Sequence, residues 1–570
     1  MEEDLKTGIL VSAFIIAVIG GTAVFLNLGL LGWGYPINAT VYTTLDRTII
    51  PVPVPASSPM LLPYQVVNYS GYGYGVWQYG EGQGYRKRLD LMPAGYNASS
   101  VNGTARLLHF FTMSDIHITD KETPAQAIYY GYRGGNPSAY SAVMLYTTQV
   151  LDAAVQTVNV LQRQEPFDFG LFLGDAINNN QYNELRWYID VIDGKTIIPD
   201  SGAKDSPVSG PLNDYQDAFK AAGLNRSIPW YQVLGNHDQF FLGVNPMNDY
   251  LRTTLTGRDI LNTGNTLTDP LGPDSRGFFM GSIDGRTRYG DVIGAGPEGE
   301  FNSTPKVSAA DPKRHALSRP AWIGEFFNTT SRPRGHGFNE SDAAAGFACY
   351  AFEPKAGVPI KVIVLDDTQK DTDPNTGPYM YGSLDTARYE WLVKELDQGQ
   401  EQGKLMIIAA HIPIRDELPN SSKLWSSASP ASEQKLVAKL HTYPNLILWL
   451  AGHVHRNTVT AFPSPDPARP ELGFWEVETA SLRDFPQEFR TFEIIRNSDN
   501  TVSVFAMDVD PSVRDGSPAA ISRSYAVATV QIFNSTIVPS PSGVYNAELV
   551  KELSPEMQEK IRDYGIPAGT

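Results

Sequence analysis

Short apolar runs, each ending in a polar residue, recur along the chain from residue 106 onward. Each run has the length and composition of a buried β-strand. The predicted strands cover residues 107–115, 167–175, 229–238, 360–367, 404–411 and 445–455. Apolar residues at helical spacing predict intervening helices over 141–163, 384–401 and 432–442. Buried strands that alternate with helices predict an α/β fold.

The rest of the chain divides into further elements, insertions and flanking segments. Residues 473–508 and 524–533 are predicted as strands, and 546–563 as a terminal helix. Residues 194–228 and about 240–345 are rich in Gly, Pro, Asp and Asn, so we interpret them as insertions between core strands. The Pro-, Gly- and Tyr-rich residues 34–105 are interpreted as a spacer or packing segment. The main domain is then 106–537, followed by a C-terminal tail at 538–570.

The segment Gly8–Trp33 contains no charged residue in 26 positions. As a helix it would be about 39 Å long, enough to cross a bilayer core of about 30 Å. It predicts an uncleaved transmembrane anchor, with residues 1–33 forming a cytoplasmic stub and the anchor. A cleaved signal peptide, whose apolar region is usually shorter, and a buried core helix are the alternatives.

Ten N-x-S/T sequons follow this segment, where about four would be expected by chance. They lie at Asn38, Asn68, Asn97, Asn102, Asn225, Asn302, Asn328, Asn339, Asn420 and Asn534. We expect a single-pass protein of the cell membrane whose bulk is extracytoplasmic, with these asparagines as glycosylation candidates. A turn-rich sequence that inflates the count is the alternative.

The amino-acid composition argues against some binding partners and excludes some kinds of metal site. The chain has 45 basic and 62 acidic residues, a net charge of −17, which argues against binding a polyanion over a broad surface. No nucleic-acid partner is therefore predicted. An extracellular nuclease would need a basic groove from the arginines of the second insertion, which are Arg252, Arg258, Arg276, Arg286 and Arg288. The single cysteine, Cys349, excludes an intramolecular disulfide and a Cys₄ metal site, so any metal would be held by His, Asp, Glu or Asn.

Polar clusters stand at the carboxyl ends of the predicted strands. They are Asp115 with His117, Gly174 with Asp175, Gly235 through Asp238, His411, and Gly452 with His453 and His455. Five of the nine histidines fall in these clusters. In an extended segment, D-x-H and H-x-H place both side chains on one side. A single site shared by all the clusters is the economical interpretation.

The ordered set D-x-H, G-D, G-N-H-D, H and G-H-x-H over residues 113–455 resembles the calcineurin-like metallophosphoesterase superfamily. The long spacings resemble an exported branch with insertions. The resemblance implies a four-layer α/β/β/α sandwich that holds two divalent metal ions. It implies one ion on Asp115, His117 and His455, the other on Asn236, His411 and His453, and Asp175 between them. Such oxygen and imidazole ligands suit Mn, Fe, Zn or similar ions.

The resemblance also implies roles beyond the metal ligands. His237 would be the general acid that protonates the leaving alcohol, and Asp238 is a candidate to orient it. The acid and arginine that follow G-D in many members are absent, so Asn178 or Asn179 is a candidate to bind the substrate phosphate; turn-forming asparagines are the alternative.

The expected function is an outward-facing, membrane-anchored phosphoesterase that hydrolyses phosphomonoesters or phosphodiesters with metal-activated water. A cell-surface glycoprotein with a structural or adhesive role on a phosphoesterase fold is the alternative. The expected partners are a phosphate-ester substrate and, through the N-terminal helix, a membrane.

Overall fold

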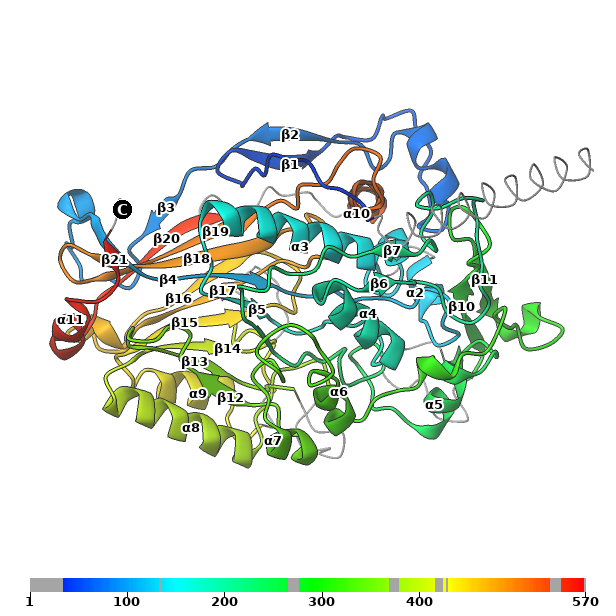
Figure 1. Ribbon diagram of the computed structural model, residues 1–570. Helices are drawn as coiled ribbons and strands as arrows, with labels where there is room; N and C mark the ends of the chain where they lie inside the picture. The colour runs from blue at the N-terminus through cyan, green and yellow to red at the C-terminus, as the bar shows by residue number, and fades with distance from the viewer. Residues whose placement is uncertain are drawn as a thin grey trace, which may run out of the picture.

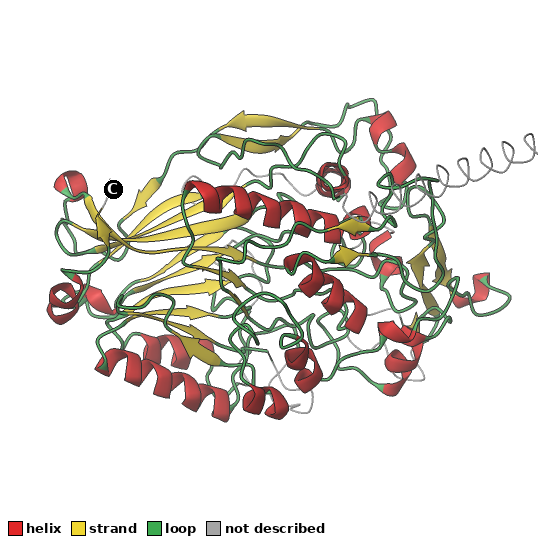
Figure 2. Ribbon diagram, viewed as in Figure 1, coloured by secondary structure: helices red, strands yellow, loops and turns green. Residues whose placement is uncertain are grey.

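Two large β-sheets form the centre of the molecule (Figure 2). The computed structural model describes residues 34–132, 136–264, 276–368, 379–415, 424–426, 429–533 and 545–567. Helices border both sheets, which confirms the predicted mixed α/β class.

The first sheet has eight strands and joins distant parts of the chain. Its order is β3 (Arg86–Arg88), β20 (Asn546–Lys551), β19 (Val502–Val509), β18 (Phe489–Asn497), β4 (Gly103–Met113), β5 (Phe169–Phe172) and β8 (Trp230–Gln232), with β21 (Ile566–Pro567) paired to β4. Strands β4, β5 and β8 run parallel, so their carboxyl ends meet at one edge region.

The second sheet has six strands. Its order is β12 (Tyr350–Phe352), β13 (Ile360–Val364), β14 (Leu405–Ala409), β15 (Leu446–Ala451), β17 (Phe474–Glu478) and β16 (Thr458–Phe462). The four middle strands are parallel, and the two outer pairings are antiparallel. Because β14 and β15 are buried on both faces, their sequences are apolar throughout, as is typical of interior parallel strands.

Alternate residues of the second sheet face two different apolar clusters. Ile407 belongs to a cluster shared with Phe110 and Leu171 of the first sheet, so the two sheets pack against each other. Ile408 belongs to a second cluster, shared with Leu392 of α8 (Thr386–Glu401). Figure 1 shows α3 (Thr147–Gln164) and α10 (Pro518–Ile532) on one side of the molecule, and α8 and α9 (Glu433–Leu440) on the opposite side.

The α-helices are short apart from α3, α8 and α10. They are α2 (Ile128–Tyr132), α3 (Thr147–Gln164), α4 (Tyr182–Ile192), α5 (Asp249–Thr256), α6 (Arg319–Glu325), α7 (Glu340–Ala345), α8 (Thr386–Glu401), α9 (Glu433–Leu440), α10 (Pro518–Ile532) and α11 (Pro555–Ile561). Asp385 begins α8 by accepting a hydrogen bond from the Arg388 amide at 2.8 Å, which satisfies one of the free amides of the first turn.

The two insertions contain structure of their own. The first carries the pair β6 (Thr196–Ile197) and β7 (Phe219–Lys220), and the second carries the sheet β9 (Asn262–Thr263), β10 (Phe278–Ile283) and β11 (Val292–Pro297). The Ile283 amide donates to the Lys121 carbonyl at 3.2 Å, and the Leu261 amide donates to Pro124 at 2.9 Å. The second insertion therefore packs on the loop that follows β4.

Two predicted elements are wrong. Residues 524–533 lie in helix α10, not in a strand, because Ser517 and Pro518 provide a helix start and the segment packs on α3. The predicted terminal helix at 546–563 begins with strand β20 instead, and only α11 is helical there. Strand β20 pairs with β19 through residues such as Leu549, so tertiary pairing decided its conformation.

The segments at either end of the predicted main domain are part of the central architecture. Strand β20 from the predicted tail and β3 from the predicted spacer both lie in the first sheet. Within residues 34–105, β1 (Arg47–Pro51) and β2 (Trp77–Glu81) form a separate antiparallel pair. Leu61 and Tyr69 join an apolar cluster with Ala528 of α10. These residues of the segment therefore pack against α10.

Within the described residues, no helix is long and apolar enough to cross a membrane. The predicted anchor at Gly8–Trp33 lies outside the described residues.

Replacing Ile407 by Ala tests the contact between the sheets. We expect Ile407→Ala to lower the free energy of unfolding by about 2–5 kcal/mol, because it leaves a cavity between two close-packed sheets. Urea unfolding followed by tryptophan fluorescence measures the loss. Val67→Ala, at an exposed site, should change stability by less than about 0.5 kcal/mol. Equal effects of the two substitutions would contradict the assigned core.

Candidate metal centre

The loops that follow five parallel strands bring the predicted site residues together. Asp115 and His117 follow β4, and Asp175 follows β5. Backbone hydrogen bonds connect these loops: the Asp115 amide donates to Gly174 at 3.2 Å, and the His117 amide donates to Asp175 at 3.0 Å. Asn236 and His237 follow β8, whereas His411, His453 and His455 follow β14 and β15 of the second sheet. The site therefore lies where the carboxyl ends of the two sheets meet.

Five of these residues have left-handed backbone conformations, which are uncommon for residues other than glycine. The positive φ angles are 50° at Asp115, 48° at His117, 50° at Asp175, 71° at His453 and 61° at His455. Each costs on the order of 1–3 kcal/mol and persists only where the surroundings enforce it. Strain shared by residues from three separate loops indicates a functional constraint.

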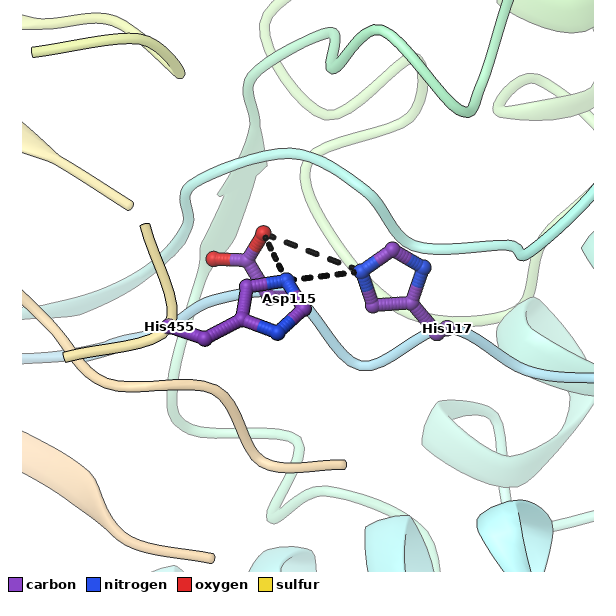
Figure 3. Close-up of side chains that lie close together, drawn as sticks. All are labelled: Asp115, His117 and His455. Carbon is purple, nitrogen blue, oxygen red and sulfur yellow. Dashed lines mark hydrogen bonds and ion pairs between the residues drawn. The ribbon is translucent and has the colours of Figure 1, made fainter. Parts of the chain in front are cut away.

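Asp115, His117 and His455 form the first group (Figure 3). The Nε2 atom of His455 lies 3.2 Å from Asp115 Oδ1 and 3.1 Å from His117 Nε2. The His117 Nε2 atom lies 3.8 Å from the same carboxylate oxygen. Asp115 Oδ1 is buried and, among the described residues, has no hydrogen-bond partner of good geometry. A buried carboxylate oxygen facing imidazole nitrogens is suited to bind a cation.

Asp175, His411 and His453 form the second group. Asp175 Oδ2 lies 3.2 Å from His411 Nε2 and 3.7 Å from His117 Nε2, so this carboxylate lies between the two groups. Asn236 Oδ1 lies 2.9 Å from His411 Nε2 and 3.1 Å from His453 Nδ1. The Asn236 amide nitrogen donates to the Gly243 carbonyl at 3.1 Å, which turns the amide oxygen toward the histidines.

His237 lies beside both groups. Its ring centroid is 4.5 Å from that of His117, and it forms a third group with His117 and Asp175. The Nδ1 atom donates to the Asn178 carbonyl at 2.7 Å, which leaves Nε2 available. His237 is half-buried, as are His453 and His455, whereas Asp115 and Asp175 are buried. The three histidines therefore line the accessible side of the site.

In each ligand group, a carboxylate and a histidine shift the pKa of one another. Burial opposes charge on Asp115, but the positive charges of His455 and His411 hold the pKa of this carboxyl below its ordinary value. Burial would also lower the pKa of His455, yet Asp115 and Asp484 raise it to about 10. The pKa of His411 is likewise raised to about 10, against burial, mainly by Asp175. A bound cation would replace these protons, because the metal-binding form of histidine is neutral.

His453 differs from the two paired histidines. Burial, reinforced by the charge of His411, lowers its pKa to about 3, so its ring is neutral near pH 7. Its nitrogen faces Asn236, an uncharged amide oxygen. Together, the clustered carboxylate, amide and imidazole groups fit a metal site for hard or borderline divalent ions.

Sequence reasoning did not identify the groups that hold these side chains in place. Asp484 Oδ2 accepts a hydrogen bond from His455 Nδ1 at 2.6 Å, which directs Nε2 into the site. The Leu173 carbonyl does the same for His411 Nδ1 at 2.8 Å. Asp367 accepts from the Ile412 amide at 2.9 Å. The spacing of residues along the sequence gives no sign of Asp484, because Asp484 reaches His455 only when the connection between β17 and β18 is folded.

The contacts of Asp238 differ from its expected role, whereas those of Asn178 and Asn179 leave their expected role untested. Asp238 does not orient His237: its carboxylate accepts from the Gly235 amide at 2.8 Å and the Ile177 amide at 3.3 Å, and so it holds the loops instead. The Asn178 backbone carbonyl, described above, holds the His237 ring. Asn179 donates its side-chain amide to Ala125 at 2.7 Å. Substrate binding by Asn178 or Asn179 stays a prediction.

Eight of the ten candidate sequon asparagines lie within the described residues, and none of the eight is buried. Asn68 and Asn225 are half-buried, and the other six are exposed. Asn420 and Asn534 lie outside the described residues.

Comparison with known proteins gives limited similarity. No protein-family model matches the chain, and no curated protein matches it. Among solved structures, a dimetal phosphatase from Danio rerio is similar, with a TM-score of 0.36 and 12% sequence identity. That match covers 71% of this chain and 97% of the other.

Removing the carboxylate of Asp484 tests its contact with His455. We expect Asp484→Ala to weaken metal affinity about 10- to 100-fold, because the His455 ring loses its orienting partner. Metal retained against a graded series of chelator concentrations measures the affinity. Asp484→Asn should be intermediate, since its amide oxygen still accepts but carries no charge. Asp515→Asn, at an exposed carboxylate, is the control. An unchanged metal affinity in Asp484→Ala would show that Asp484 does not orient His455 for metal binding.

Proposed function

We propose that the chain is a dinuclear metal-dependent phosphoesterase built on a four-layer α/β/β/α sandwich. The main support for this proposal is that the candidate metal-ligand groups have residues in common. His117 belongs to two of the groups, and so does Asp175. The groups thus form one continuous constellation, not separate single-ion sites. We propose Asp115, His117 and His455 for one ion, Asn236, His411 and His453 for the other, and Asp175 for both.

Divalent ions held there would supply Lewis-acid activation of water and of the phosphoryl group. The chain's own residues prepare the site for an anionic ester. The left-handed loops hold the ligand atoms in place before substrate arrives, and burial of Asp115 and Asp175 excludes bulk water from their carboxylates. Preorganised groups of this kind need little rearrangement during reaction.

His237 is proposed as the acid that protonates the leaving alcohol. Its Nδ1 proton is held by the Asn178 carbonyl, so Nε2 is the atom that exchanges a proton with substrate. The His237 amide donates to Asp175 Oδ1 at 2.8 Å, which places the ring at a defined position beside the ligand groups. A histidine positioned in this way contributes typically 10²- to 10⁴-fold to rate.

Location at the cell surface is part of the proposal. The apolar segment Gly8–Trp33 and the sequons after it support a single-pass protein with its bulk outside the cell. Exposure or partial exposure of the eight described sequon asparagines is compatible with modification.

The purified full chain, reconstituted with Mn, Fe or Zn salts, tests the catalytic proposal. We expect about two metal ions per chain and metal-dependent hydrolysis of p-nitrophenyl phosphate or bis-p-nitrophenyl phosphate. Asp175→Asn should lower kcat at least about 100-fold, because it removes the carboxylate between the two groups. Asp515→Asn should retain activity. Two bound ions without turnover of either ester would instead favour the surface-glycoprotein role.

The role of His237 is tested by changing the leaving group. We expect His237→Ala to lower kcat by about 10²-fold or more for phenyl phosphate, which needs its leaving oxygen protonated. The loss should be much smaller for p-nitrophenyl phosphate, whose leaving group is stable as an anion. His315→Ala, at an exposed histidine outside the site, is the control. Equal losses on both esters would argue against an acid role.

Membrane attachment is tested by deleting residues 8–33. We expect the full chain to stay with membranes through an alkaline carbonate wash and the deletion variant to be released, since the apolar segment is long enough to span a bilayer. Immunoblots of pellet and supernatant measure the partition. Release of the full chain by the wash would contradict the anchor.

A further inference from the structure

Arg483 is a buried guanidinium whose hydrogen-bond donors are poorly satisfied. Arg483 is only 2% exposed, and its Nε atom is buried and has no hydrogen-bond partner among the described residues. Its two terminal nitrogens both lie 3.4 Å from a single acceptor, the Ser138 carbonyl oxygen. Good N–H···O bonds are 2.7–3.2 Å long, so this contact is weak. Within the described part of the chain, five N–H donors therefore share one distant oxygen.

Other buried arginines in this protein do not share this condition. Arg490 pairs with Asp508 at 2.9 Å, and Arg314 pairs with Asp120 at 3.1 Å. The carboxylate next to Arg483 in the chain, Asp484, is hydrogen-bonded to His455. Burial raises the pKa of Asp484, and the positive charge of Arg483 lowers it, so the two charges interact without a hydrogen bond. Buried hydrogen-bond donors without acceptors are unfavourable, so the guanidinium calls for a ligand that supplies the missing acceptor oxygens.

The backbone of Arg483 is fixed against the metal centre. Its amide lies 3.3 Å from the Asp115 carbonyl, and Ser481 donates its hydroxyl to the same carbonyl at 2.7 Å. Burial is the main cause that lowers the pKa of His117 and of His237, and the positive charge of Arg483 adds to it at both rings. Arg483 therefore lies near the site, with its backbone bonded to the carbonyl of Asp115.

We propose that Arg483 binds a non-bridging oxygen of the substrate phosphoryl group, replacing its weak contact with Ser138. The inference rests on the proposed phosphoesterase function and names its substrate-binding arginine. Guanidinium and phosphate match in a fork geometry, with two parallel N–H···O bonds. The terminal nitrogens and the orphaned Nε provide the donors that such an anion needs. Arg483 is a substrate-binding residue, and the metal ligands do not depend on it.

The test uses inorganic phosphate as the probe, with the metal-reconstituted full chain in a calorimeter. We expect Arg483→Met to weaken phosphate binding about 10- to 100-fold, the range for one lost charge-assisted bond. Arg483→Lys should recover part of the affinity, because it keeps the charge but not the fork. Arg286→Gln removes the same charge from an exposed site and should have no effect. Metal content is measured for every variant.

Thermal unfolding of the same variants separates binding from a structural role. Buried donors that lack good acceptors destabilise the chain, so Arg483→Met should leave the phosphate-free unfolding midpoint unchanged or raise it. Wild-type phosphate affinity in Arg483→Met, or a lowered midpoint with unchanged affinity, would overturn the inference. If the wild type bound no metal or hydrolysed no ester, the proposed function would be rejected instead. The phosphate affinities of the wild type and of Arg483→Met, both measured without added metal, would then still decide whether Arg483 binds phosphate.

Discussion

The contact between Asp175 and His411 connects the two central sheets at the point where chemistry is expected. Asp175 follows β5 of the first sheet and His411 follows β14 of the second, yet Oδ2 and Nε2 lie 3.2 Å apart. Such a distance requires that the apolar cluster between the sheets hold their spacing and register. The same carboxylate reaches His117 at 3.7 Å, so the relative position of the two ligand groups depends on the same packing.

This arrangement has a cost in stability that the core offsets. Asp115 and Asp175 are buried carboxylates, and several site residues have left-handed backbones. His455 lies 3.2 Å from Asp115 and His411 lies 3.2 Å from Asp175, so each carboxylate has an imidazole beside it, and a bound cation would contact both. Arg483 adds a buried charge of the opposite sign that has no bonded anion. The site therefore concentrates interactions that favour ligand binding over folding.

Sequence reasoning worked best where burial is complete. Within the predicted strands 404–411 and 445–455, the residues of β14 and β15 are apolar throughout because both faces are covered, and this pattern does not depend on distant residues. It failed at 524–533, which was predicted as a strand, because a Ser-Pro start and packing on α3 produce helix α10 there. It also failed at residue 546, since only pairing with β19 makes β20 a strand.

The sequence by itself determined the α/β class and the inventory of candidate ligands, because strand-end clusters such as Asp115 with His117 are local features of spacing and composition. Tertiary structure alone decided which atoms face one another: that Asn178 and not Asp238 holds the His237 ring, that Asp484 orients His455, and that Arg483 is left without a bonded anion. The physical reason is distance along the chain. Residues separated by tens to hundreds of positions contact one another only after the two sheets have packed, and no local pattern records such a contact.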